Sequence, residues 1–157
     1  MTTGEAHDGR KRLLWTLALV AWVCVVWGHS MVPADLSAEE SSRFLFLVRP
    51  LFGLFGSSDE GLMTHVIRKT AHFLEYVVLM AIGSRTARAW FDAPRSRAVL
   101  LGVIWVVIPC VDEFIQTFVP ARDGNPSDVL LDMAGGVAGL LLARAIARRR
   151  DRPEGTG

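Results

Sequence analysis

Residues 13–32 read LLWTLALVAWVCVVWGHSMV, an apolar run without Asp, Glu, Lys or Arg. A helix needs about 20 apolar residues to cross the hydrocarbon core of a bilayer, so this run is long enough to span it. The basic flank Arg10-Lys11-Arg12 resembles the start of a signal peptide. However, the apolar stretch is too long for a typical signal sequence and no A-x-A cleavage site follows. The run therefore predicts a first membrane helix.

The rest of the chain predicts three more membrane helices. Apolar residues make up 51% of the sequence, and the charged residues gather between apolar runs, a pattern typical of bilayer proteins. The predicted helices cover about 13–32, 66–87, 98–119 and 127–146. They form a transmembrane domain over 13–146, between an N-terminal tail over 1–12 and a basic tail over 147–157. The sequence thus predicts an all-α, four-transmembrane-helix bundle.

A mixed loop over 33–65 separates the first two predicted helices. Its segment 44–55 is apolar but short, and Pro50 and Gly53 interrupt it. This composition favours a short interfacial segment over a further span. The spacings of Ser37 with Glu40, and of Ser57 with Glu60, are those of capping boxes and predict two short helix starts.

Basic residues predict the orientation. One group of segments is rich in them: Arg10, Lys11, Arg12, Arg85, Arg88, Arg95, Arg97, Arg144, Arg148, Arg149, Arg150 and Arg152. The alternating segments hold fewer: Arg43, Arg49, Arg68, Lys69 and Arg122. The positive-inside rule places the richer group in the cytoplasm, which predicts that both termini are cytoplasmic. A basic tail beside a membrane helix is typical of a topology anchor, so no nucleic-acid partner is predicted.

Polar side chains on the last three predicted helices fall in the same half of the bilayer. With the predicted orientation this is the outer half, on the order of 10 Å below the helix ends. The candidate pocket residues are Arg68, Lys69, His72, Glu75, Tyr76, Asp112, Glu113, Gln116, Arg122, Asp128 and Asp132. Their i, i+4 and i+7 spacings put them on shared helix faces. Charges at membrane depth are costly unless paired, so we expect these groups to face the bundle interior.

Several functions are open to such a cluster. It could be a structural salt-bridge network in which Arg68, Lys69 and Arg122 are counter-ions, or a binding pocket. His72 with the carboxylates could ligate a divalent cation or act as acid and base. No HExxH, P-loop or nucleophile elbow is present, so we lean against an enzyme and predict no cofactor and no metal. A proton-coupled transporter is disfavoured because no acid lies in the inner half of a predicted helix.

Three minor features carry weaker predictions. Gly135 and Gly139 form a GxxxG pair, which favours close packing within the bundle over a homo-oligomer interface. Cys24 and Cys110 have no disulfide or zinc pattern and are predicted to be small packing residues. His29, near the outer surface, is predicted to be an incidental interfacial residue.

Two motifs carry a family resemblance over residues 13–146. The run Arg68-Lys69-Thr70-Ala71-His72-Phe73-Leu74-Glu75-Tyr76 resembles the RKxxHFxEY signature of VanZ-like membrane proteins. Asp112-Glu113-Phe114-Ile115-Gln116, followed by Arg122 and Asp128, resembles the second signature, DExxQxF…R…D. This chain departs from the family at Asp132, where the family usually has Asn.

The resemblance implies a multi-pass protein of the bacterial inner membrane. Because the namesake of the family is linked to resistance to the glycopeptide teicoplanin, it implies a role in antibiotic resistance or maintenance of the cell envelope. The partners it implies, besides the bilayer, are an envelope lipid, a lipid-linked cell-wall precursor or a glycopeptide. A membrane enzyme that acts on a lipid-linked substrate through His72 and the carboxylates is the alternative.

Overall fold

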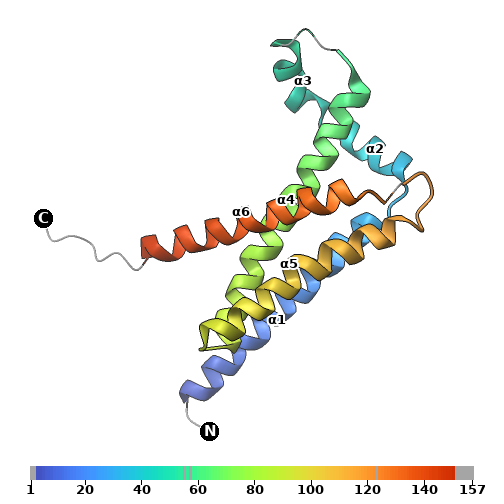
Figure 1. Cartoon of the computed structure of the whole chain (residues 1–157). Helices are drawn as coiled ribbons and strands as arrows, with labels where there is room; N and C mark the ends of the chain where they lie inside the picture. Colours follow the sequence, from blue (N-terminus) through green and yellow to red (C-terminus); the bar gives the residue numbers. More distant parts are fainter. Residues whose placement is uncertain (1–2, 55, 57, 123, 151–157) are drawn as a thin grey trace, which may run out of the picture.

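The computed structural model describes residues 3–54, 56, 58–122 and 124–150, which form six helices and no strand (Figure 1). This confirms the all-α prediction. The helices are α1 (Thr3–Ser30), α2 (Ala34–Ser42), α3 (Leu45–Leu54), α4 (Glu60–Trp90), α5 (Pro94–Gln116) and α6 (Pro126–Arg150). Three of those helices, α1, α5 and α6, are long and apolar enough to cross a membrane. The chain is therefore a multi-pass membrane protein.

The fourth long helix, α4, differs in composition. Its 31 residues make it the longest of the six described helices, but Arg68, Lys69 and Glu75 interrupt its apolar sequence. It is accordingly not among the three long apolar helices. The prediction of four spans is thus met in three helices.

The observed helices extend beyond most of the predicted bounds. α1 begins at Thr3 instead of residue 13, and α4 at Glu60 instead of 66, because helical hydrogen bonding continues through polar residues that the apolar pattern does not include. α6 continues to Arg150, so the first part of the basic tail is helical. Two helices stop short of their predicted C-terminal ends: α1 ends at Ser30 instead of 32, and α5 ends at Gln116 instead of 119. Residues 151–157, with Arg152, lie outside the described residues.

The capping-box prediction at Ser37 is wrong. Ser37 lies inside α2, which begins after Pro33, a residue with no side-chain cap. Ser57 lies outside the described residues, and the cap of α4 is Asp59, whose carboxylate accepts a hydrogen bond from the Leu62 N–H at 3.0 Å. The apolar segment beside them is the short helix α3, which ends before Phe55, a residue also outside the described part.

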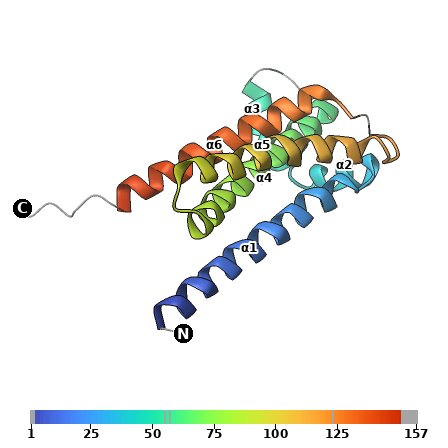
Figure 2. The same ribbon diagram turned by 60° about the horizontal axis from the view of Figure 1, so that its bottom comes forward.

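α4 is the central helix, since it contacts each of the other five described helices (Figure 2). Tyr76, Leu79 and Met80 of α4 pack with Val26 of α1 and Ile104 of α5 in the buried core. α6 crosses α4 in Figure 1, and their backbones touch there.

Two glycines of α6 permit that crossing. A Cβ on Gly135 would lie 2.5 Å from the Phe73 carbonyl oxygen, and one on Gly139 would lie 2.9 Å from Val77 Cα. Both glycines therefore face α4 of the same chain. This is the packing function that the sequence favoured, and the alternative, a homo-oligomer interface through Gly135 and Gly139, is wrong because α4 occupies that face.

Indole N–H groups form hydrogen bonds between the helices. Trp22 of α1 donates to the Glu75 carbonyl oxygen on α4 at 2.9 Å, and Trp105 of α5 donates to the Met133 carbonyl oxygen on α6 at 2.8 Å.

Cys24 and Cys110 are both free thiols, and both are exposed. The prediction that these thiols pack inside the bundle is therefore wrong, because the helix positions they occupy face outward.

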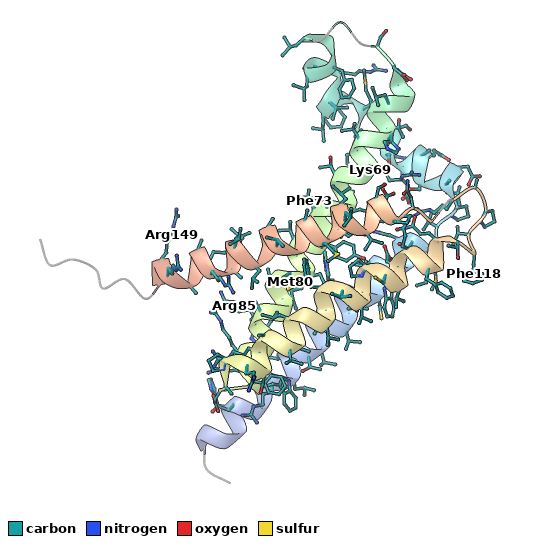
Figure 3. All side chains as sticks on the ribbon, in the orientation of Figure 1. Lys69, Phe73, Met80, Arg85, Phe118 and Arg149 are labelled. Carbon is teal, nitrogen blue, oxygen red and sulfur yellow. The ribbon has the colours of Figure 1, made fainter. Side chains whose placement is uncertain are left out.

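Two ends of the bundle differ in charge. Figure 3 shows Arg85 and Arg149 toward one end, and Lys69 and Phe118 toward the other. At the first end the Arg12 Nε donates to the Ala89 carbonyl oxygen at 2.9 Å, so the start of α1 lies beside the end of α4. Arg12, Arg85 and Arg149 of the arginine-rich segments therefore lie toward one end of the described chain, and Lys69 of the predicted pocket lies toward the other.

Candidate functional site

The candidate residues lie where the polar half of α4 meets the end of α5, the start of α6 and the end of α1. Tyr76, Asp112, Glu113, Gln116, Arg122 and Asp132 are buried. Arg68, Lys69, His72, Glu75 and Asp128 are half-buried. None of the candidates is fully exposed on the surface, because the i, i+4 and i+7 spacings turn one face of each helix toward its neighbours.

Several of these groups pair with one another. Lys69 of α4 forms an ion pair with Asp128 of α6. Glu113 accepts hydrogen bonds from the Asn125 N–H at 2.6 Å and from Gln116 Nε2 at 3.2 Å. These contacts join α4 to α6 and α5 to the residue before α6, and they give two of the carboxylates their partners.

Arg122 does not bridge carboxylates. Among the described residues it forms no ion pair. Instead, its Nη2 donates to the His29 carbonyl oxygen at 3.2 Å, at the end of α1. It follows Ala121, whose φ of 56° turns the chain sharply, and this places the guanidinium against α1. Burial lowers the pKa of Arg122, and the positive charge of Arg68 acts in the same direction.

His29 is a residue whose role the sequence interpretation missed. Its Nδ1 is hydrogen-bonded to Glu75 Oε1, so it is a partner of the site and not an incidental interfacial residue. A signal was available: the predicted orientation places the end of the first span at the same level as the start of the second. The depth of His29 therefore matched that of the pocket.

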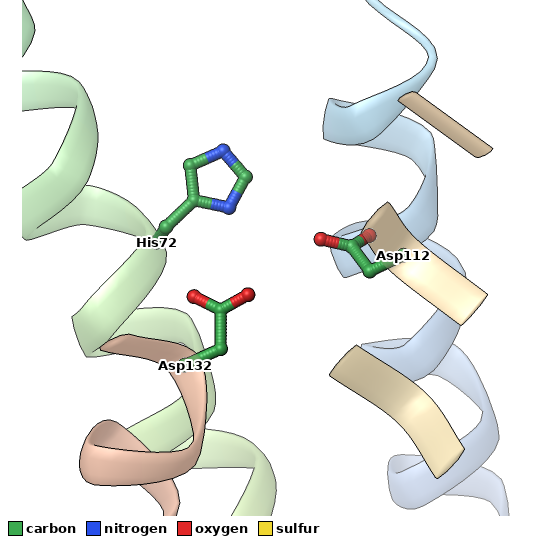
Figure 4. A group of neighbouring side chains, drawn as sticks. All are labelled: His72, Asp112 and Asp132. Atoms are coloured by element: carbon green, nitrogen blue, oxygen red, sulfur yellow. The ribbon is translucent and has the colours of Figure 1, made fainter. Parts of the chain in front are cut away.

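Three side chains from three helices converge deeper in the site (Figure 4). His72 of α4, Asp112 of α5 and Asp132 of α6 each offer a donor atom, and these atoms lie within 4.8 Å of one another. Asp112 and Asp132 are 0% and 1% exposed, and none of their carboxylate oxygens has a hydrogen-bonding partner among the described residues.

Two cavities adjoin His72. One, of about 20 Å³, is lined by Arg68, Lys69, Glu113, Asp128 and Asp132 as well as His72, and a volume of that order holds about one water molecule. The other, of about 200 Å³, lies between α4 and α2. Its polar lining includes His29, Arg68, His72, Glu75 and Arg122, and Glu40 of α2 and Phe44, which precedes α3, also border it.

Comparison with known proteins identifies one family. The family described as VanZ/LLP1 matches residues 15–148, which covers both motifs and every candidate residue. No curated protein and no solved structure matches the chain. The match confirms the resemblance found from the two signatures.

Proposed function

Because the chain belongs to the VanZ/LLP1 family, we propose that it is a four-span protein of the bacterial inner membrane that binds the anionic headgroup of an envelope lipid or lipid-linked cell-wall precursor. Both termini lie in the cytoplasm, and the polar site opens toward the outer leaflet. The position of Arg12, Arg85 and Arg149 toward the opposite end supports this orientation.

The length of α4 supports its crossing of the bilayer. Its 31 residues correspond to about 46 Å, against a hydrocarbon core of about 30 Å. Arg68 and Arg85 lie about 26 Å apart along the helix, so each can reach a headgroup region. His72 and Glu75 then lie inside the outer leaflet but within the bundle, where α1, α5 and α6 shield them from lipid.

The proposal of headgroup binding rests on the pair of arginines in the larger cavity. Arg68 and Arg122 both line this cavity, and neither forms an ion pair among the described residues. Arg122 is 8% exposed and its Nε has no hydrogen-bonding partner there. A guanidinium group that forms no ion pair is suited to a phosphate, which it binds through two parallel N–H bonds.

The size of the cavity selects among the ligands that the family resemblance implies. A volume of about 200 Å³ is below the range of about 300–1,000 Å³ typical of drug-sized ligands. It suits a phosphate and the first carbons of a headgroup. A glycopeptide antibiotic is several times larger, so a role in resistance would act through the lipid or the precursor and not through capture of the drug.

Native mass spectrometry of the full chain in detergent tests the proposal, with phosphatidylglycerol and phosphatidylcholine as probes. Wild type should retain phosphatidylglycerol preferentially. Arg68→Gln and Arg122→Gln each remove a charge-assisted hydrogen bond worth about 1.5–3 kcal/mol, so phosphatidylglycerol should bind about 10–150-fold more weakly. Arg43→Gln is the control, because Arg43 is exposed on the same side and pairs with Glu39. Equal retention of both lipids by wild type would refute headgroup selectivity.

A further inference from the structure

The deeper part of the site contains two buried carboxylates without an observed counter-charge. Asp112 and Asp132 are almost fully buried, and their oxygens have no partner among the described residues. Two carboxylates this close repel each other, and removing each from water adds a further cost. Such an arrangement requires a positive charge or protons between them.

The basic residues nearby, Arg68 included, form no ion pair with Asp112 or Asp132 among the described residues. Lys69 pairs with Asp128, and His29 pairs with Glu75. Arg122 donates to the His29 carbonyl oxygen. Of the ion pairs between described residues, none includes Asp112 or Asp132. The protein therefore does not neutralise this pair with its own cations in the described part of the chain.

The third member of the group is an imidazole. His72 brings a ring nitrogen to within 4.8 Å of a carboxylate oxygen from each aspartate. A metal ion bound at about 2.0–2.2 Å from each donor would draw the three groups slightly closer together. Figure 4 shows the three side chains directed toward a common space from α4, α5 and α6.

From this geometry we propose that His72, Asp112 and Asp132 bind one divalent cation of the Zn²⁺ or Mn²⁺ class. Two carboxylate oxygens and one imidazole nitrogen match the donors that these ions accept, whereas a copper(I) site would need soft sulfur ligands. A dication balances the two carboxylate charges, which removes the electrostatic cost of the pair. Three protein ligands also leave coordination positions open for water.

The surroundings fit such a site. The hydroxyls of Tyr76 and Ser30 are buried near Asp112. They can hydrogen-bond a ligand carboxylate, as groups around metal sites commonly do. His72 and Asp132 line the small cavity and His72 also borders the larger one, so a cation can enter from the outer end. The cation site does not depend on headgroup binding, since it rests on other residues.

Metal binding by the tag-free full chain in detergent tests the proposal. After treatment with chelator, the protein is equilibrated with Zn²⁺ or Mn²⁺ and its bound metal is measured by plasma mass spectrometry. Wild type should retain about one equivalent. Loss of an outer partner of a metal site costs about 10–100-fold in affinity, so loss of a ligand should cost at least about 100-fold. We expect this for Asp112→Asn, Asp132→Asn and His72→Gln.

Asp35→Asn is the matched control. Asp35 is exposed in the first turn of α2 and is not a candidate site residue, so its substitution should leave the bound metal unchanged. Wild type that retains no more metal than Asp132→Asn, or an equal loss in Asp35→Asn, would overturn the proposal. If the ligand variants do not fold, titration of the wild type with Co²⁺ tests the metal site instead. Visible absorption bands that saturate at one equivalent support the site, and their absence refutes it.

Discussion

Replacement of Gly139 by alanine tests the contact that brings α6 against α4. The new Cβ would lie 2.9 Å from both Cα and the carbonyl carbon of Val77, and closer still to its carbonyl oxygen. Carbon atoms normally approach to about 3.5–4.0 Å, so the helices must separate by about 0.6–1 Å. Overpacking of this kind costs about 1–3 kcal/mol. For a chain of this size, that lowers the melting temperature by about 2–12 °C.

Gly102→Ala provides the reference for this measurement. A Cβ on Gly102 meets no atom within 4 Å, and alanine favours a helix over glycine by about 0.5–1 kcal/mol. Because both variants gain this propensity, the difference between their apparent melting temperatures isolates the cost of the contact. The assay is tryptophan fluorescence on heating in one detergent at one scan rate. Equal melting temperatures for the two variants would show that α6 does not pack against α4 at Gly139.

Three further predictions follow from the site and the orientation. A reporter that is active only in the periplasm should work when fused in the loop 33–65 or near Gly124 and fail at residue 92 or at the C-terminus; a periplasmic C-terminus would contradict the orientation. Arg122→Lys should weaken phosphatidylglycerol retention about 10-fold, because a planar guanidinium can direct separate N–H groups at a phosphate and at the His29 carbonyl oxygen, and an ammonium lacks this geometry. Binding equal to wild type would show that Arg122 does not bind the phosphate in this way. His72→Gln should accumulate in the membrane as wild type does yet lose the envelope phenotype, scored as sensitivity to glycopeptide or detergent; loss of the protein itself would return His72 to a structural role.

The depth of the polar groups could be predicted from the sequence, because helical rise converts residue number into distance along the membrane normal. His72, Asp112 and Asp132 were placed at one level in this way, and the structure brings their donor atoms within 4.8 Å. The glycine face of α6 was also predictable, since small residues four apart leave room for another backbone.

The pairing of individual side chains could not be predicted. Arg122 was expected between carboxylates, but the positive φ of Ala121 directs the chain so that Arg122 meets the His29 carbonyl oxygen. The spacing of residues in the sequence does not determine the backbone conformation of this loop. Likewise, the cap of α4 depends on which of several polar residues before the helix adopts an extended backbone, and Asp59 does so.

The polarity of α4 has a consequence for biogenesis. Arg, Lys and Asp each raise the free energy of insertion of an isolated helix by about 2.5–3.5 kcal/mol at its centre, so α4 is poorly retained by lipid when it first leaves the ribosome. The helices α5 and α6, which pack against it, are made later, and the close approach of α6 depends on Gly135 and Gly139. In the proposed four-span topology, commitment of α4 to the bilayer is therefore postponed until the last helix is synthesised. Chains truncated before α6 should accordingly be recognised and degraded by membrane quality control.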